Sequence, residues 1–222
     1  MNTPSIFRTD NLQIVQNNLK DLLNGCRDFE NEHIIESPRS VGDAVQQVLA
    51  KKMASCFPDG IIRKFQGDFA RRAMPDVAFE DADGNYFAVD IKTHNESTDF
   101  NMPNLTSVER LSRFYEDAGN YFVIVLAEYR PNGPGIAFDN VRFFPIEHLK
   151  WDCLTIGALG WGQVQIADAR RVDIDRRQSR KDWMIELCNR LNAFYPKEID
   201  KIKRRMDRFS QVRIFWNNRS DF

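Results

Sequence analysis

The chain has 222 residues, of which 42% are hydrophobic and 28% are charged, values typical of a soluble globular protein with one sizeable core. It holds no apolar run long enough to cross a membrane, and its first ten residues lack the pattern of a secretion signal. Its four cysteines are far apart and form no CxxC pair. This argues against a zinc site or a disulfide framework and favours free thiols in a reducing cytoplasm.

The formal net charge is −1, so the chain lacks the overall basic character of many nucleic-acid-binding proteins. The charges are unevenly spread, however. Residues 168–222 carry 15 Lys and Arg against 9 Asp and Glu, whereas residues 1–167 carry 16 against 23. A basic C-terminal segment fits an anionic partner on one side of the molecule, and solvated helix faces explain it at least as well.

Two amphipathic helices are expected near the N-terminus. Residues 10–23 carry a stripe of Leu and Val, with Asp10 as the expected cap and Gly25 as the stop. Residues 40–56 carry a second apolar side. These helices, within residues 10–56, are candidates for a dimer interface. A turn at 58–60 then leads into a short strand, "IIRKF".

The stretch "MPDVAFEDADGNYFAVDIKTHN", residues 74–95, reads as a β-hairpin. Gly84 suits the left-handed position of a three-residue loop, Ala82 to Gly84, which makes Asp81 pair with Asn85. In that register Asp76 lies opposite Asp90. One face is then apolar, and the other carries both aspartates. The apolar face consists of Val77, Phe79, Phe87, Val89 and Ile91, and the other of Asp76, Ala78, Ala88, Asp90 and Lys92.

The remaining elements follow in order along the chain. Residues 104–119 indicate a helix, 121–129 a buried central strand, and 136–144 a strand that returns from it. Residues 159–168 form a glycine-rich loop that enters a short alternating strand. Ser179 should cap a helix over 179–195, Pro196 should break it, and a basic helix should follow over 197–209. We therefore expect one α/β domain over residues 1–222, with a central mixed β-sheet flanked by helices.

The polar face of the hairpin is a candidate site. Opposed residues in an antiparallel pair have Cβ atoms about 5 Å apart, so two aspartates would repel each other there. A hard cation such as Mg²⁺ removes that repulsion, because it takes carboxylate, water and phosphate oxygens as ligands. Lys92 points to the same face and can hold a water molecule or offset charge on a phosphate. The alternative is a solvated face on which Lys92 forms a salt bridge with Asp76 or Asp90.

Pro75-Asp76, thirteen residues, and then Asp90-Ile91-Lys92 resemble the PD-(D/E)xK nuclease motif, and "VDIKT" is similar to the blunt-cutting type II restriction endonucleases of the EcoRV and HincII kind. "MPNLTSVERL", "YFVIVLAEY" and "WGQVQIADARRVDIDRRQSRKDW" resemble segments that follow in that group, in the same order, from roughly residue 40 to 205. The resemblance implies a restriction endonuclease-like core and a homodimer around double-stranded DNA. It also implies Mg²⁺-dependent cleavage of a palindromic site, which leaves 5′-phosphates and blunt ends. A cognate DNA methyltransferase is the expected companion.

The resemblance also assigns roles within the candidate site. Asp76 and Asp90 would be metal ligands, with the Ile91 carbonyl as a possible third. Lys92 would orient or activate the attacking water. An acid from an early helix often joins such sites, and Asp43 is the carboxylate best placed for that role. Asp43 could equally be a first-turn charge that favours the helix dipole.

The DNA-reading residues are expected in the loop after the catalytic strand and in a recognition segment of about residues 155–181. Asn101 and Asn104 carry amides that can pair with base edges, although Asn104 could instead cap the following helix. Gln163 is the first choice for a base contact and Gln165 for a supporting role. Phosphate contacts are expected from His94, Arg170 and Arg171.

Two other functions fit the same residues. One is a structure-selective repair or junction nuclease of the same superfamily, which would cut according to DNA shape. The other is a non-catalytic DNA-binding module in which the motif arises by coincidence. The presence of all three motif residues argues against the second, since a degenerate copy would often have lost one.

Overall fold

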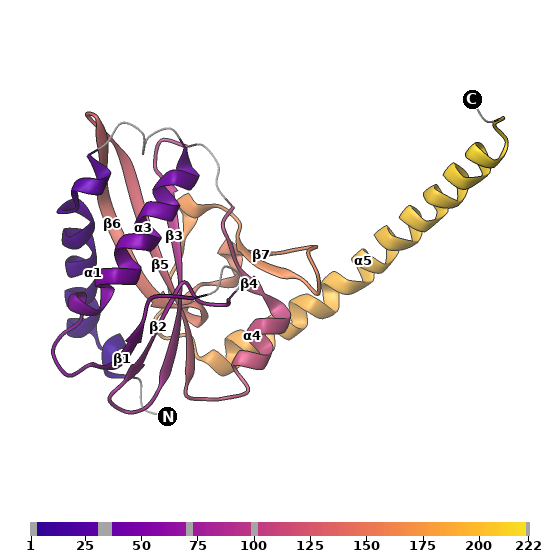
Figure 1. Ribbon diagram of the computed structural model, residues 1–222. Coiled ribbons are helices and arrows are strands. Elements are labelled where there is room, and N and C mark those ends of the chain that lie inside the picture. Colours follow the sequence, from indigo (N-terminus) through magenta and orange to yellow (C-terminus); the bar gives the residue numbers. More distant parts are fainter. Residues whose placement is uncertain (1–3, 31–36, 70–72, 99–101, 221–222) are drawn as a thin grey trace. The chain divides into compact units, whose positions relative to one another are not determined.

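The computed structural model describes residues 4–30, 37–69, 73–98 and 102–220 (Figure 1). The chain divides into two compact units, Met1–Arg177 and Gln178–Phe222, and each is described here by itself. The expectation of a single nuclease domain over residues 1–222 stays a prediction.

The first unit is built on a five-stranded mixed sheet in the order β1-β2-β3-β5-β6, which confirms the α/β class. Strands β3 and β5 run parallel, and the other neighbouring pairs run antiparallel. The central strand is therefore β3, and β5 lies beside it. The bounds are Ile62–Gln66 for β1, Val77–Asp81 for β2, Tyr86–Asn95 for β3, Asn120–Asn132 for β5 and Gly135–Pro145 for β6.

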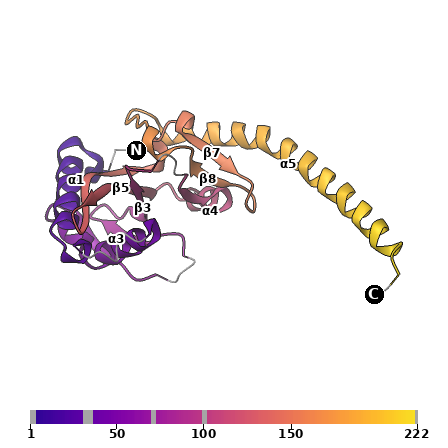
Figure 2. The same ribbon diagram turned by 90° about the horizontal axis from the view of Figure 1, so that it is seen from above.

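Two helices cover one face of this sheet, α1 (Thr9–Asn24) against β6 and α3 (Pro38–Lys52) against β3 (Figures 1 and 2). Asp10 is not the cap of α1, because Arg8 precedes the helix and Asp10 lies inside its first turn. Gly25 ends α1 as expected. The second helix starts two residues earlier than expected, since the Ser37 side chain accepts a hydrogen bond from the Ser40 N–H and Pro38 fits the first turn.

The hairpin of β2 and β3 has the register expected from the sequence. Val77 pairs with Val89 and Phe79 with Phe87, and Gly84 adopts a φ of 84° in the loop. The Phe79 and Phe87 rings stack with centroids 4.5 Å apart. The apolar face of the hairpin joins the main core, which confirms the assignment of the two faces.

The opposite face of the hairpin is also covered, which the sequence analysis did not foresee. Asp90 is only 5% exposed, and Ile124, its partner on β5, is fully buried. Ala88 and its partner Phe122 are buried in the same way. The part of the polar face around Ala88 and Asp90 is therefore not a solvated surface.

A second, three-stranded antiparallel sheet has the order β4-β8-β7, with β4 at Asn104–Ser107, β8 at Gln163–Ile166 and β7 at Leu154–Gly157. The helix expected over residues 104–119 was wrong in its first part. Residues 104–107 pair with β8 instead, and the helix α4 spans only Val108–Phe114. Ser107 caps α4 by accepting the Arg110 N–H. Pairing with a strand some 60 residues away thus overrides the local helical pattern.

Short 3-10 turns connect these elements, and they are η1 (Ser5–Phe7), η2 (Arg27–Phe29), η3 (Met53–Cys56), η4 (Ile146–His148), η5 (Trp151–Cys153) and η6 (Ala169–Arg171). The cysteines Cys26, Cys56, Cys153 and Cys188 are free thiols.

The second unit consists of one long helix, α5 (Arg180–Asn217), capped by Ser179 as expected. The predicted break at Pro196 is wrong, since the helix continues through it. Proline has no N–H to donate to the carbonyl four residues earlier, which here belongs to Asn192. Asn192 is an exposed residue, so water can take the place of the lost donor. Within the described ranges, no helix combines the length and the apolar character that a membrane span requires.

Candidate active site

The two motif aspartates meet where β2 begins and β3 passes beside it. Asp76 directly precedes β2, and its N–H donates to the Val89 carbonyl at 2.9 Å. Asp76 Oδ2 accepts the Ile91 N–H at 2.7 Å. The hairpin therefore holds the Asp76 carboxylate beside the strand that carries Asp90. Ile91 takes part through its N–H, whereas the expected role of its carbonyl as a metal ligand stays a prediction.

Lys92 and Asp90 form a partly buried ion pair on the same strand, with Lys92 Nζ 2.7 Å from Asp90 Oδ1. Burial raises the pKa of Asp90 to about 7, the nearby Lys92 ammonium opposes this rise, and the Asp76 charge adds to it. Burial also raises the pKa of Asp76. The hydrogen bond from the Ile91 N–H and the charge of Lys92 act in the opposite direction and lower this pKa. The expected salt bridge thus exists, but on a partly buried face where the Asp90 charge is costly to desolvate.

One carboxylate oxygen of this cluster lacks a hydrogen bond within the described residues. Asp90 Oδ2 is buried and has no hydrogen-bond partner among the residues that the structure describes. A buried carboxylate oxygen without a partner is unfavourable unless another group completes it. It therefore marks the point at which a ligand would attach.

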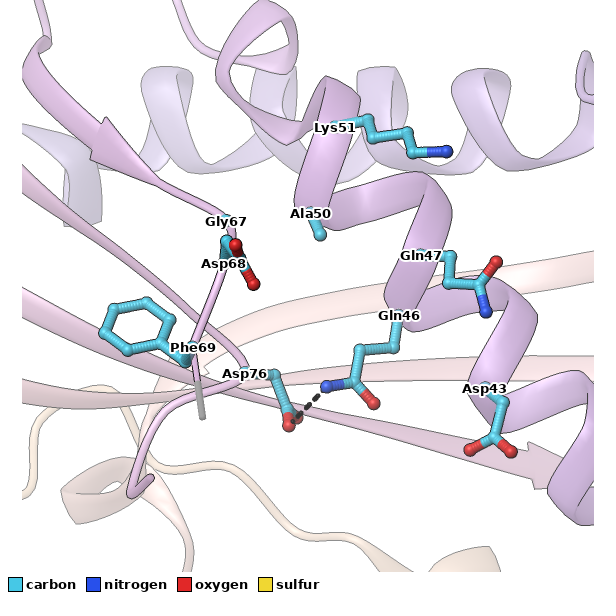
Figure 3. A pocket seen from close by; sticks show the side chains of 9 residues that line it. All are labelled: Asp43, Gln46, Gln47, Ala50, Lys51, Gly67, Asp68, Phe69 and Asp76. Atoms are coloured by element: carbon cyan, nitrogen blue, oxygen red, sulfur yellow. Dashed lines mark hydrogen bonds between the residues drawn. The ribbon is translucent and has the colours of Figure 1, made fainter. Parts of the chain in front are cut away.

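Helix α3 contributes Gln46, and not Asp43, to Asp76. Gln46 Nε2 donates to Asp76 Oδ1 at 2.9 Å (Figure 3). Asp43 lies one turn earlier on the same helix, is exposed, and pairs with Arg39 at 3.9 Å. Gln46 lies one turn after Asp43 in the sequence and was not predicted to take part in the site. Its spacing of three residues from Asp43 was the available signal, because such residues share a helix face.

An open cavity of about 590 Å³ brings Asp43, Gln46 and Asp76 together with Asp68 (Figure 3). Asp68 follows β1 and was not identified from the sequence, since no motif links it to the hairpin. Its neighbour Gly67 passes so close to α3 that an added Cβ would lie 1.9 Å from the Ala50 carbonyl oxygen. Only glycine permits that approach, which brings the Asp68 segment against the helix.

The donor set of the site suits a hard cation rather than zinc. Asp76 and Asp90 offer carboxylate oxygens, and the described part of the chain contains no group of three or more His, Cys, Asp or Glu side chains placed to hold a metal. Mg²⁺ commonly uses one or two carboxylates and completes its shell with water and phosphate oxygens. Asp90 Oδ2, which has no partner in the part of the chain that the structure describes, can serve as a ligand of this kind, so the residues present fit Mg²⁺.

The predicted recognition strand has the expected alternation, with Val164 and Ile166 buried and Gln163 and Gln165 partly exposed. Gln165 Nε2 donates to Asn104 Oδ1 on the neighbouring strand. The small sheet therefore joins these two predicted DNA-reading residues. Asn104 does not cap α4, because Ser107 does. Asn101 lies outside the described residues.

The residues expected to contact phosphate fall into two groups. Arg170 and Arg171 are exposed, and their side chains lie 3.0 Å and 3.8 Å from Asp168. His94 shares the face of Asp90 but is only 2% exposed, so its side chain is not open to a phosphate. Burial also lowers the pKa of His94, which favours its neutral form. The alternation of side chains along β3 predicts that His94 shares a face with Asp90, but it cannot predict that this face is covered at His94.

No protein-family model matches the chain, and no curated protein sequence matches it. The geometry of Asp76, Asp90, Lys92 and Gln46 is therefore the basis for a functional proposal.

Proposed function

We propose that this protein is a Mg²⁺-dependent type II restriction endonuclease that hydrolyses phosphodiester bonds of double-stranded DNA. The observation that carries the proposal is the partly buried cluster of Asp76, Asp90 and Lys92, in which the buried Asp90 Oδ2 has no partner within the described residues. Two carboxylates and an ammonium in one partly buried cluster are costly for folding alone. They are useful where charge develops on a phosphate.

The residues of this cluster have distinct roles in the proposed reaction. Asp76 and Asp90 would hold Mg²⁺, which would stabilise negative charge on the phosphate and make the attacking water more acidic. The Ile91 N–H and the Gln46 amide fix the Asp76 carboxylate by hydrogen bonds to its two oxygens. Lys92 orients the attacking water. The new bond joins the water oxygen to phosphorus, and the bond to the 3′ oxygen breaks. The attacking water releases a proton and the 3′ oxygen takes one up from solvent, which leaves a 5′-phosphate and a 3′-hydroxyl.

Site specificity is proposed to come from the three-stranded sheet. Gln163 projects from β8 with part of its surface exposed, and Gln165 and Asn104 support each other by a hydrogen bond. Glutamine and asparagine amides pair with the edges of adenine. A homodimer would apply this sheet to both halves of a palindrome and cut both strands, with blunt ends. A DNA methyltransferase of the same specificity would protect the host DNA.

The experiment is digestion of a phage or genomic DNA with the purified protein and Mg²⁺, beside Asp90→Ala. Asp83→Ala, at the exposed tip of the same hairpin, is the matched control. The proposal expects discrete fragments from wild type and Asp83→Ala, none from Asp90→Ala, and fragment ends that share one palindromic sequence. Cleavage confined to branched DNA would favour a structure-selective nuclease. Duplex binding without any cleavage would reduce the protein to a DNA-binding module.

A further inference from the structure

Helix α5 exposes large apolar side chains along most of its length. Ile199, Ile202, Met206 and Phe209 are 51%, 50%, 65% and 71% exposed. They follow one another at alternating steps of three and four residues. An isolated helix seldom keeps such a stripe in water, so the stripe indicates a surface that another element covers.

The same alternation runs on in both directions and fits a heptad repeat. We call these ten positions the α5 seam, and they are Ile185, Cys188, Asn192, Tyr195, Ile199, Ile202, Met206, Phe209, Arg213 and Trp216. A strict repeat of 3.5 residues keeps one face of a helix in contact with another helix in a left-handed supercoil. Trp183 and Leu187, the buried residues of α5, occupy outer positions of this repeat, on the side away from the seam.

We propose that the α5 seam pairs in parallel with the α5 seam of a second copy of this chain, as a two-stranded coiled coil. This goes beyond the proposed nuclease function and does not depend on it. A second copy is the fitting partner because it presents the same repeat in the same register. Asn192 occupies an a position, where an asparagine pairs with its own counterpart in a parallel dimer.

The flanking charges also agree with a parallel pair. In a parallel pair, each residue that directly precedes an a position of the seam faces, on the other helix, the residue that is five positions later in the sequence. Arg205 faces Ser210 of the partner subunit, and Glu198, which also bonds Lys201 on its own helix, faces Lys203 of the partner subunit. No like charges meet along these flanks. An antiparallel pair centred on Ile199 and Ile202 would instead place Asn192 against an apolar Phe209 of the partner subunit.

Basic side chains lie both within the α5 seam and on its outer side. Arg213 is a charged residue in an a position, so pairing weakens near the end of the helix, and the seam is strongest between Asn192 and Phe209. The basic side chains Lys201, Arg204 and Arg208 lie at outer positions and remain exposed when the seam is covered. Pairing therefore leaves the basic outer surface of α5 free for an anionic partner.

Sedimentation of the full chain tests the seam. Met206→Glu places a carboxylate in the seam, and Gln211→Glu places one on the outer surface of the same helix. We expect the dimer dissociation constant to rise at least tenfold for Met206→Glu and to stay within twofold of wild type for Gln211→Glu. A wild type that is monomeric at all concentrations, or equal effects of the two variants, overturns the proposal. So does a Met206→Glu variant that keeps its self-association and loses only DNA binding.

Cross-linking tests the orientation. In a chain with Cys188→Ser, Phe209→Cys is treated with a short bis-maleimide, and Gln211→Cys serves as the outer control. A parallel seam places residue 209 beside its counterpart, so Phe209→Cys gives a covalent dimer and Gln211→Cys does not. The antiparallel arrangement separates the two copies of residue 209 by roughly 25 Å, beyond the reach of the linker. Absence of the Phe209→Cys cross-link in a dimeric sample overturns the proposal.

Discussion

Gln46 Nε2 donates a 2.9 Å hydrogen bond to Asp76 Oδ1, so a neutral amide of α3 holds the first motif carboxylate. The Ile91 N–H holds its other oxygen. The carboxylate is thus fixed from a helix and from the neighbouring strand. Side chains that orient a metal ligand in this way affect metal affinity without touching the metal.

Gln46→Ala should therefore weaken Mg²⁺ binding about 10- to 100-fold, because Asp76 loses one of its two hydrogen bonds. Gln47→Ala is the control, since Gln47 lines the same cavity and is exposed. Calorimetric titration with Mg²⁺ measures the effect. Equal affinities in the two variants would show that Gln46 does not position Asp76.

Lys92→Gln should lower the single-turnover cleavage rate about 10²- to 10³-fold, since one charged group near the phosphate is lost. Mg²⁺ affinity should change far less, because Lys92 is not a proposed ligand. Lys64→Gln removes another lysine of the same sheet that pairs with a carboxylate, Glu80, and should cleave normally. A variant that keeps the full rate would remove Lys92 from the chemistry.

Mg²⁺ should stabilise the wild type against unfolding and should not stabilise Asp90→Asn. A ligand that binds only the folded state contributes about 2.7 kcal/mol at 100 times its dissociation constant. Thermal melts with and without Mg²⁺ measure this directly and need no DNA. Asp83→Asn should respond as the wild type does. An equal shift in Asp90→Asn would place the metal elsewhere.

Gln163→Ala should relax the base preference at one position of the cleavage site, at a cost of about 1 to 3 kcal/mol in discrimination. Gln165→Ala should act through Asn104, since these two side chains are hydrogen-bonded. Asn104→Ala should have the same effect as Gln165→Ala, and the double variant should show no larger effect than either single variant. Sequencing of the fragment ends from each variant distinguishes these outcomes. Unchanged specificity in Gln163→Ala would exclude it as the base-reading residue.

His148 should make the folded protein less stable as the pH falls below about 6.5, which is the usual pKa of histidine. Burial lowers its pKa in the folded chain, Arg176 also lowers it, and the nearby Glu147 and Asp175 raise it. The stability from the neutral imidazole is present above pH 6.5 and is lost as the pH falls toward the folded pKa. His148→Gln should show a flatter dependence in unfolding experiments from pH 8 to 5. Proton NMR of the imidazole should show a midpoint below 6.5, and a midpoint above it would contradict the prediction.

Local patterns predicted the hairpin in detail. The three-residue loop, the position of Gly84, and the pairs Val77–Val89 and Phe79–Phe87 follow from the alternation of side chains and from one turn residue. These features depend only on residues within the hairpin. The α/β class, α1 and the cap of α5 could be predicted for the same reason.

Features that depend on distant contacts could not be predicted in this way. Residues 104–107 have a helical pattern, but they pair with β8, whose position is set by the whole fold. The break expected at Pro196 was wrong for a local reason, since the hydrogen bond that proline removes is that of the exposed residue Asn192. Gln46 replaced Asp43 beside Asp76 because the rotation of α3 against β3 decides which side chain reaches the strand.

The sequence by itself determined which residue types could form the site and the register that pairs Val77 with Val89, next to Asp76 and Asp90, because strand register is a local property. Only the tertiary structure decided how buried they are. Covering the second face of β3 raises the pKa of Asp90 to about 7 and leaves its Oδ2 without a partner in the described ranges. Burial depends on what packs above a residue, and that is set by segments far away in the chain.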